Sequence, residues 1–110
     1  MKDIRLQMDA SKFHLKGPLV VADSVQVIID GVVHRLPSVR VQTEAVKHNL
    51  TCLIGDPSYD KFAFLMYGAL DQLGFCFEDC QIVQKNSTVI KLRAYGVQEK
   101  DHGKSSITTS

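Results

Sequence analysis

The sequence lacks long hydrophobic runs, a large excess of positive or negative charge, and an even number of cysteines that could all pair as disulfides. Its apolar stretch Leu19–Ala22 is far shorter than the ~18 residues that a membrane-spanning helix needs. The first residues, Met1–Arg5, alternate charged and apolar side chains, unlike the apolar segment of a signal peptide. Three cysteines, an odd number without an export signal, indicate free thiols in a reducing compartment. We therefore expect a cytoplasmic protein without a membrane partner.

The size and composition indicate one folded domain. The chain has 110 residues, of which 45% are hydrophobic, enough to form a core. Thirteen Lys and Arg against twelve Asp and Glu give a net charge of +1, so binding to nucleic acid would need a local basic patch. We expect a single domain over residues 1–98. Residues 99–110, with Ile107 as the one sizeable apolar side chain, are expected to form a flexible tail.

The clearest local pattern is a β-hairpin over residues 25–36. Asp30-Gly31 lies between two β-branched runs and suits a two-residue type I′ turn, because both residues tolerate positive φ. Such a turn places three pairs on the core face: Val25 with Leu36, Val27 with His34, and Ile29 with Val32. Alternation of apolar and polar residues predicts further strands over residues 4–8, 12–16, 39–42 and 50–54. Residues 44–49 are compatible with a helical turn or a loop.

One substantial helix is expected after Asp56, which suits the N-cap, with Pro57 in the first turn and Gly74 after the last. At 100° per residue, one broad apolar stripe is formed by Tyr59, Phe62, Leu65, Met66, Ala69, Leu70 and Leu73. Gly68 falls on the opposite, polar side of the helix. Phe64 also falls among the polar positions, with Tyr67 at the border of the stripe, so these two aromatic residues do not fit the pattern.

A second hairpin is expected from about Phe75 to Tyr95, with its turn around residues 85–87. Pairing Val83 with Val89 brings complementary side chains together across the strands. This register places Gln81 opposite Lys91, Asp79 opposite Arg93, and Phe77 opposite Tyr95. The opposite, apolar face would carry Cys76 and Cys80.

Together these elements predict an α+β fold. We expect a twisted antiparallel sheet of five to seven strands, rich in hairpins, with one main helix packed on its concave side. The same strands could alternatively close into a partial barrel.

No catalytic or metal-binding motif is present. On a strand, Cys76 and Cys80 would lie ~13 Å apart, too far for a disulfide or a shared zinc ion. Cys52 shares a side with apolar neighbours, so all three thiols are expected to be buried. His34 could act as a base that activates Cys52 as a nucleophile, but no oxyanion-hole motif accompanies the two residues. We expect no enzyme activity and no cofactor or metal; a Cys/His enzyme is the least favoured alternative.

The favoured function is protein binding. Phe64 and Tyr67 are large aromatic side chains on or near a helix face that should be wet, and aromatic residues are enriched at interfaces. Sheet edges could also pair with a second copy or with another protein. We therefore expect a small interaction or regulatory module, with a homodimer favoured. The opposing interpretation is that Phe64 is covered by a loop and belongs to the core.

The alternative function is binding of single-stranded nucleic acid through Phe77, Lys91, Arg93 and Tyr95. These residues would project together from the second hairpin, so that bases could stack on the rings and phosphates could bind the cations. Against this, Asp79 and Gln81 would satisfy Arg93 and Lys91. The balance depends on which other cations share that face, the candidates being Arg5, Lys12, Lys16, Arg35 and Arg40.

Overall fold

The described part of the chain forms an α+β fold in which a curled sheet surrounds one helix. The computed structural model describes residues 2–50 and 60–99. Its strands are β1 (Lys2–Asp9), β2 (Phe13–Lys16), β3 (Leu19–Ile29), β4 (Val32–Gln42), β5 (Phe75–Lys85) and β6 (Val89–Glu99). Its helices are the short 3-10 helix η1 (Ala10–Lys12), α1 (Thr43–Leu50) and α2 (Asp60–Leu73).

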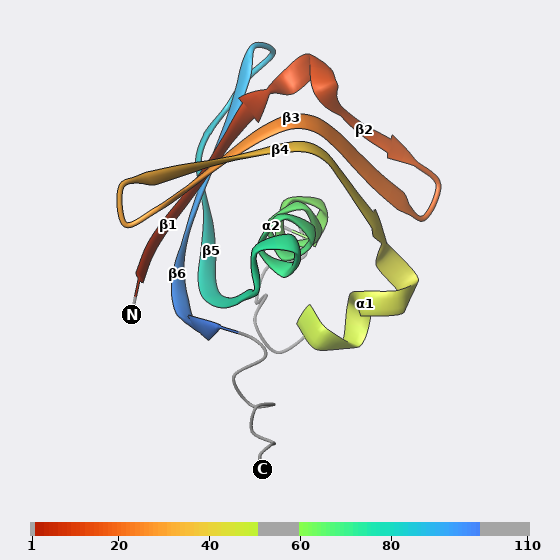
Figure 1. Cartoon of the computed structure of the whole chain (residues 1–110). Coiled ribbons are helices and arrows are strands. Elements are labelled where there is room, and N and C mark those ends of the chain that lie inside the picture. Colours follow the sequence, from red (N-terminus) through yellow and green to blue (C-terminus); the bar gives the residue numbers. More distant parts are fainter. Residues whose placement is uncertain (1, 51–59, 100–110) are drawn as a thin grey trace.

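These strands make one antiparallel sheet with the order β2-β3-β1-β6-β5, and β4 pairs with β3. The sheet arches over α2 as a half-barrel, with α1 at its open side (Figure 1). This confirms the predicted α+β class, the twisted sheet and the main helix. The expected helix start at Asp56 and Pro57 and residues 100–110 of the expected tail lie outside the described residues.

The first hairpin has the predicted register. Asp30 and Gly31 have φ values of 50° and 85°, and Ile29 faces Val32 while Val25 faces Leu36. Positive φ at both central residues is what a type I′ turn requires. The hairpin is longer than expected, because β3 and β4 remain paired as far as Leu19 and Gln42. The strand expected over residues 39–42 is therefore the end of β4.

A bend at Ser24 makes the long hairpin curl. Ala22 and Val25 are both completely buried, although three positions apart on a strand would normally face opposite sides. Ser24 between them has a φ of 55°, and Pro37 lies at the corresponding point of β4. Proline is tolerated there because β4 is an edge strand. The buried side of the hairpin thus changes at this point, and the sheet wraps around α2.

The curl buries more of α2 than one stripe. The helix contacts β3, β4 and β5, so residues on several of its sides face the sheet. The predicted stripe is buried at Phe62, Leu65, Met66, Ala69 and Leu70. Phe64 is also buried, with 8% of its surface exposed, and belongs to the same core cluster. Its expected position on a wet helix face was wrong, because a flat sheet would cover one side of the helix and this sheet covers more.

Gly68 marks the closest approach of α2 to the sheet. A Cβ atom built on Gly68 would lie 2.3 Å from Cγ2 of Val41 and 2.8 Å from Cγ1 of Val39. The prediction that Gly68 faces away from the sheet was therefore wrong. The missing side chain allows the helix backbone to pack directly on β4.

Helix α1 resolves the ambiguity at residues 44–49. Thr43–Leu50 is helical, and Thr43 bonds back to the carbonyl oxygen of Pro18 through both its N–H and its hydroxyl group, at 2.9 and 3.0 Å. The strand expected over residues 50–54 was wrong at Leu50, which ends α1. The rest of that expected strand, Cys52 included, lies outside the described residues.

The second hairpin is present, but its register differs from the predicted one. Gln81 pairs with Arg93 in place of Lys91, and Phe77 pairs with Gly96 in place of Tyr95. The register shifts at three points along β5, one of them between Glu78 and Gln81. Such irregularities insert extra residues into one strand and change which side chains face the core. Regular alternation, on which the prediction rested, does not hold along β5.

Candidate functional site

The convex face of the sheet, on the side away from α2, carries the candidate site. In β6, Ile90, Leu92 and Ala94 are buried in the core. Lys91, Arg93 and Tyr95 alternate with them and are partly exposed, so they point to the convex face. These three of the four predicted nucleic-acid residues therefore lie together, as expected.

Phe77, the fourth predicted residue, does not join them. It is 5% exposed and belongs to the core cluster under the sheet. Its expected place beside Tyr95 was wrong, because the irregular register of β5 reverses the side to which Phe77 points. Tyr95 is therefore the only one of the two predicted rings on the convex face.

A row of amide and cationic side chains crosses the convex face over five strands. Each residue of the row is the cross-strand partner of the next. In order, they are Arg35 of β4, Gln26 of β3, Gln7 of β1, Lys91 of β6 and Gln84 of β5. We call this set the glutamine row. Nε2 of Gln7 donates to Oε1 of Gln26 at 3.2 Å, which ties β1 to β3 on the surface. The row contains no acidic residue, and neither Arg35 nor Lys91 makes an ion pair with any side chain that the structure describes, which in β5 leaves out Glu78 and Asp79.

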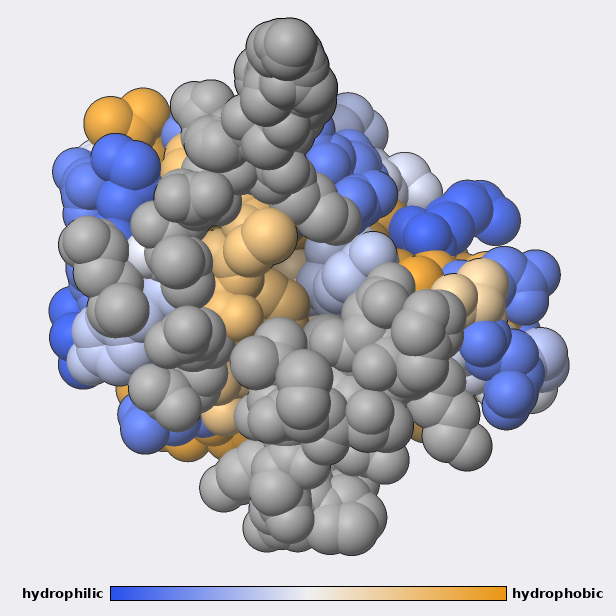
Figure 2. Space-filling model, turned by 90° about the horizontal axis from the view of Figure 1, so that it is seen from below, coloured by the Kyte–Doolittle hydropathy of each residue, from blue (hydrophilic) through white to orange (hydrophobic). Residues whose placement is uncertain are grey.

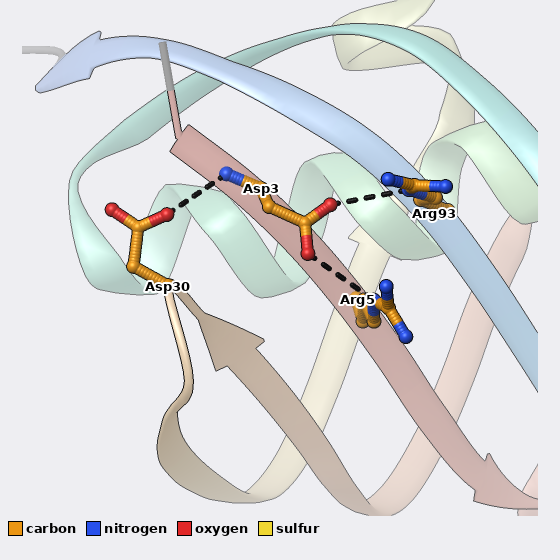
Figure 3. Close-up of polar contacts among 4 residues, drawn as sticks. All are labelled: Asp3, Arg5, Asp30 and Arg93. Atoms are coloured by element: carbon orange, nitrogen blue, oxygen red, sulfur yellow. Dashed lines mark hydrogen bonds and ion pairs between the residues drawn. The ribbon is translucent and has the colours of Figure 1, made fainter.

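The neighbouring register position holds two arginines that share one carboxylate. Arg5 and Arg93 are paired across β1 and β6. Their Nε atoms donate to the two oxygens of Asp3, at 3.2 and 3.1 Å (Figure 3). Asp3 is held in turn by the hairpin turn, because its N–H donates to Asp30 and its carbonyl oxygen accepts from the N–H of Asp30, both at 3.0 Å. The three charged side chains together keep a charge of +1.

Arg93 is oriented by a second contact. Its guanidinium carbon lies 5.2 Å from the centroid of the Tyr95 ring, within the range of a cation–π interaction. The contacts with Asp3 and Tyr95 orient the guanidinium group, while the Arg93 side chain remains 38% exposed. An oriented, exposed guanidinium plane is a surface on which a nucleic-acid base can stack.

The cross-strand partners predicted for Arg93 and Lys91 differ in the structure. Asp3 supplies a carboxylate to Arg93, and the side chain of Asp79, the predicted partner of Arg93, lies outside the described part of the chain. Gln81, which carries no charge, stands opposite Arg93, and Gln84 stands opposite Lys91. Of the other cations considered, Arg5 and Arg35 share the convex face with Lys91 and Arg93. Lys12 lies in η1, Lys16 in β2, and Arg40 in the part of β4 beyond the bend. Asp3, Arg5, Arg35 and the glutamines could not be found from the sequence, because their neighbours belong to strands far away in the chain.

Comparison with known proteins adds no assignment: neither the protein-family models, nor the curated proteins, nor the solved structures contain a match to this chain. Within residues 2–50 and 60–99, neither helix has the length and apolar character needed to cross a lipid bilayer.

The two predicted interface residues are in different environments. Phe64 is buried in the core and offers no free surface. Tyr67 is half-buried and lines a groove of about 180 Å³ between the end of β4, α1 and α2. Arg40, Val46 and Asp71 also line this groove. Seen from below, the surface shows hydrophobic atoms near its centre with hydrophilic residues toward its margins (Figure 2).

The two cysteines in the described part of the chain, Cys76 and Cys80, are free thiols in different environments, and Cys52 lies outside that part. Cys76 is exposed, contrary to the prediction, while burial raises the pKa of the half-buried Cys80 to about 12. Within the described residues, no three His, Cys, Asp or Glu side chains gather as a metal site. His34 lies opposite Val27 as predicted and is partly exposed.

Proposed function

We propose that this protein binds single-stranded nucleic acid across its convex face. The observation that supports the proposal is the cluster of Arg5, Arg35, Lys91 and Arg93 on three strands of one surface. Asp3 pairs with Arg5 and Arg93 and offsets one of their two charges, while Arg35 and Lys91 make no ion pair with the described side chains. Phosphate contacts with such cations provide most of the affinity of nucleic-acid binding, whatever the net charge of the whole chain.

The shape of the face favours a single strand over a duplex. Arg35 and Lys91 are separated by three strand spacings of about 4.8 Å each, and so by roughly 14 Å. The major groove of B-DNA is only about 12 Å wide, so this curved five-strand surface does not enter it. A flexible single strand can follow the curve, with phosphates near Lys91 and Arg35 and a base stacked on Arg93.

The direct test is a fluorescence-polarisation titration with a labelled, mixed-sequence decanucleotide at several salt concentrations. We expect binding at low salt that weakens as salt rises, because each phosphate contact releases counterions. For single strands the slope of log K against log salt is about −0.7 for each contact. An absence of binding at low salt would contradict the proposed function.

Variants locate the binding face. Arg35→Gln together with Lys91→Gln should reduce the magnitude of the slope by about 1.4, which is two contacts of about 0.7 each. Lys61→Gln is the matched control, because Lys61 lies on α2 with its Nζ 5.2 Å from the centroid of the Phe62 ring, away from the convex face. The control removes one positive charge and the double variant removes two, so an equal loss of affinity per charge removed would show that only net charge matters.

A second candidate function is protein binding at the β4 edge, with a homodimer as the simplest form. Within the described residues, β4 pairs with β3 alone, and its second edge has no partner strand. Val32 and Val33 at its start are 59% and 48% exposed, and Tyr67 lines the groove at its end. A free edge can accept a strand from another chain. Size-exclusion chromatography with light scattering over a wide concentration range tests the homodimer, and a constant monomer mass would exclude it.

A further inference from the structure

A hollow lined by both polar and apolar residues opens in the convex face beside the glutamine row. It has a volume of about 300 Å³ and is lined by Gln7, Met8, Asp9, Ser24, Gln26 and Val89. A volume of this size is at the lower limit of small-molecule sites in proteins. The hollow therefore has room for a small planar ligand and not for a folded domain.

The hollow exists because β1 separates from β3 at the bend. The two strands are paired from Ile4 and Ile29 as far as Gln7 and Gln26. Beyond this point the chain leaves β3 and attaches to the other hairpin, where the N–H of Ala10 donates to the carbonyl oxygen of Thr88 at 2.9 Å. Along this same edge, β3 has its next partner only at Ala22, which pairs with Phe13 of β2. The gap between these two pairings is the hollow.

The lining presents hydrogen-bonding groups of both kinds. Because Nε2 of Gln7 donates to Oε1 of Gln26, the side-chain oxygen Oε1 of Gln7 and the side-chain nitrogen Nε2 of Gln26, which have no other partner among the described residues, remain for a ligand. Oδ1 of Asp9 accepts from the N–H and the hydroxyl group of Ser11, at 2.9 and 2.8 Å, which hold the carboxylate in place. These bonds lower the pKa of Asp9, so it is an acceptor at neutral pH. Glutamine amides pair with adenine, and carboxylates accept from the amino group of cytosine.

Resting on the proposed function, we infer that this hollow receives one unstacked base of the bound strand and prefers bases with an exocyclic amino group. Lys91 is next to Gln7 across the strands, and Arg35 is next to Gln26, so each amide of the hollow has a cation beside it. The cations hold the phosphates of the strand, and the amides and Asp9 read one base. The carboxylate repels a phosphate, which orients the base inward and the backbone toward the cations.

The test compares four labelled decanucleotides by fluorescence polarisation at constant salt. Each is a homopolymer, one of adenine, one of cytosine, one of thymine and one of abasic units. We expect adenine and cytosine decamers to bind roughly tenfold more tightly than the thymine decamer, and the abasic decamer to bind most weakly. Equal affinity for all four would overturn the inference while leaving the proposed function intact. No binding of any decamer at low salt would instead overturn the proposed function.

Two variants and one further probe complete the test. Gln26→Leu should remove the preference for adenine and leave the salt slope unchanged, whereas Arg35→Gln with Lys91→Gln should reduce the slope and keep the preference. The second variant, Asp9→Asn, changes an exposed residue and should weaken selection of cytosine. It tests the hollow even if the Gln26→Leu protein does not fold. Adenosine monophosphate should bind far more weakly than the adenine decamer. Equal affinity for the two would show a mononucleotide site and overturn the inference.

Discussion

Gly68→Ala tests the close packing of α2 on β4, because two effects of opposite sign compete at this position. In an ordinary helix, alanine is more favourable than glycine by about 1 kcal/mol. Here the new Cβ would lie 2.3 Å from Cγ2 of Val41, well inside the contact distance of about 3.5–4.0 Å for carbon atoms. Val41 and Val39 are 4% and 0% exposed, and β-branched side chains have few alternative rotamers. The helix must therefore move.

Overpacking of this kind costs typically about 1–3 kcal/mol. After subtracting the gain in helix propensity, we expect Gly68→Ala to lower the free energy of unfolding by up to about 2 kcal/mol. Urea denaturation at 25 °C measures this difference. Val41→Ala removes the closest atom, so the double variant should lose less stability than the sum of the two single variants. A Gly68→Ala protein more stable than the original would refute the close approach of helix and strand.

Two further predictions concern the core and the thiols. Phe64→Ala should lower the free energy of unfolding by about 3–5 kcal/mol, because Phe64 is 8% exposed, whereas Val83→Ala, at a residue 60% exposed, should change it by less than about 0.5 kcal/mol. A small effect of Phe64→Ala in urea denaturation would restore Phe64 as an interface residue. In a Cys52→Ser background at pH 8, Cys76 should react quickly with iodoacetamide and Cys80 slowly. With its pKa raised to about 12, only about one Cys80 thiol in ten thousand is ionised at that pH. Peptide mapping by mass spectrometry follows both cysteines, and equal rates would contradict the burial of Cys80.

The parts of the fold that depend on neighbouring residues could be predicted from the sequence. Asp30-Gly31 specifies a type I′ turn, and this turn specifies the register of β3 and β4 down to Val25 and Leu36. The apolar stripe of α2 likewise follows from helical periodicity. In β6, regular alternation correctly placed Lys91 and Arg93 on the outer face.

The parts that depend on distant residues could not be predicted. Phe77 turns inward because β5 has an irregular register, and nothing in its local pattern shows where the irregularities fall. Phe64 is buried because the sheet bends at Ser24, a residue whose positive φ has no sequence signal of the strength of Asp-Gly. Arg93 meets Asp3 only because β6 pairs with β1, a contact between residues 90 positions apart.

The pairing of β1 with β6 also affects how the protein can fold. During synthesis, β1 can join β3 early, but its other edge has no partner until β6 leaves the ribosome. An unpaired strand edge at the middle of the future sheet is prone to intermolecular aggregation, and pairing over long sequence separations is slow. Since the convex face is assembled only when β6 docks, any ligand of that face distinguishes finished molecules from incomplete ones.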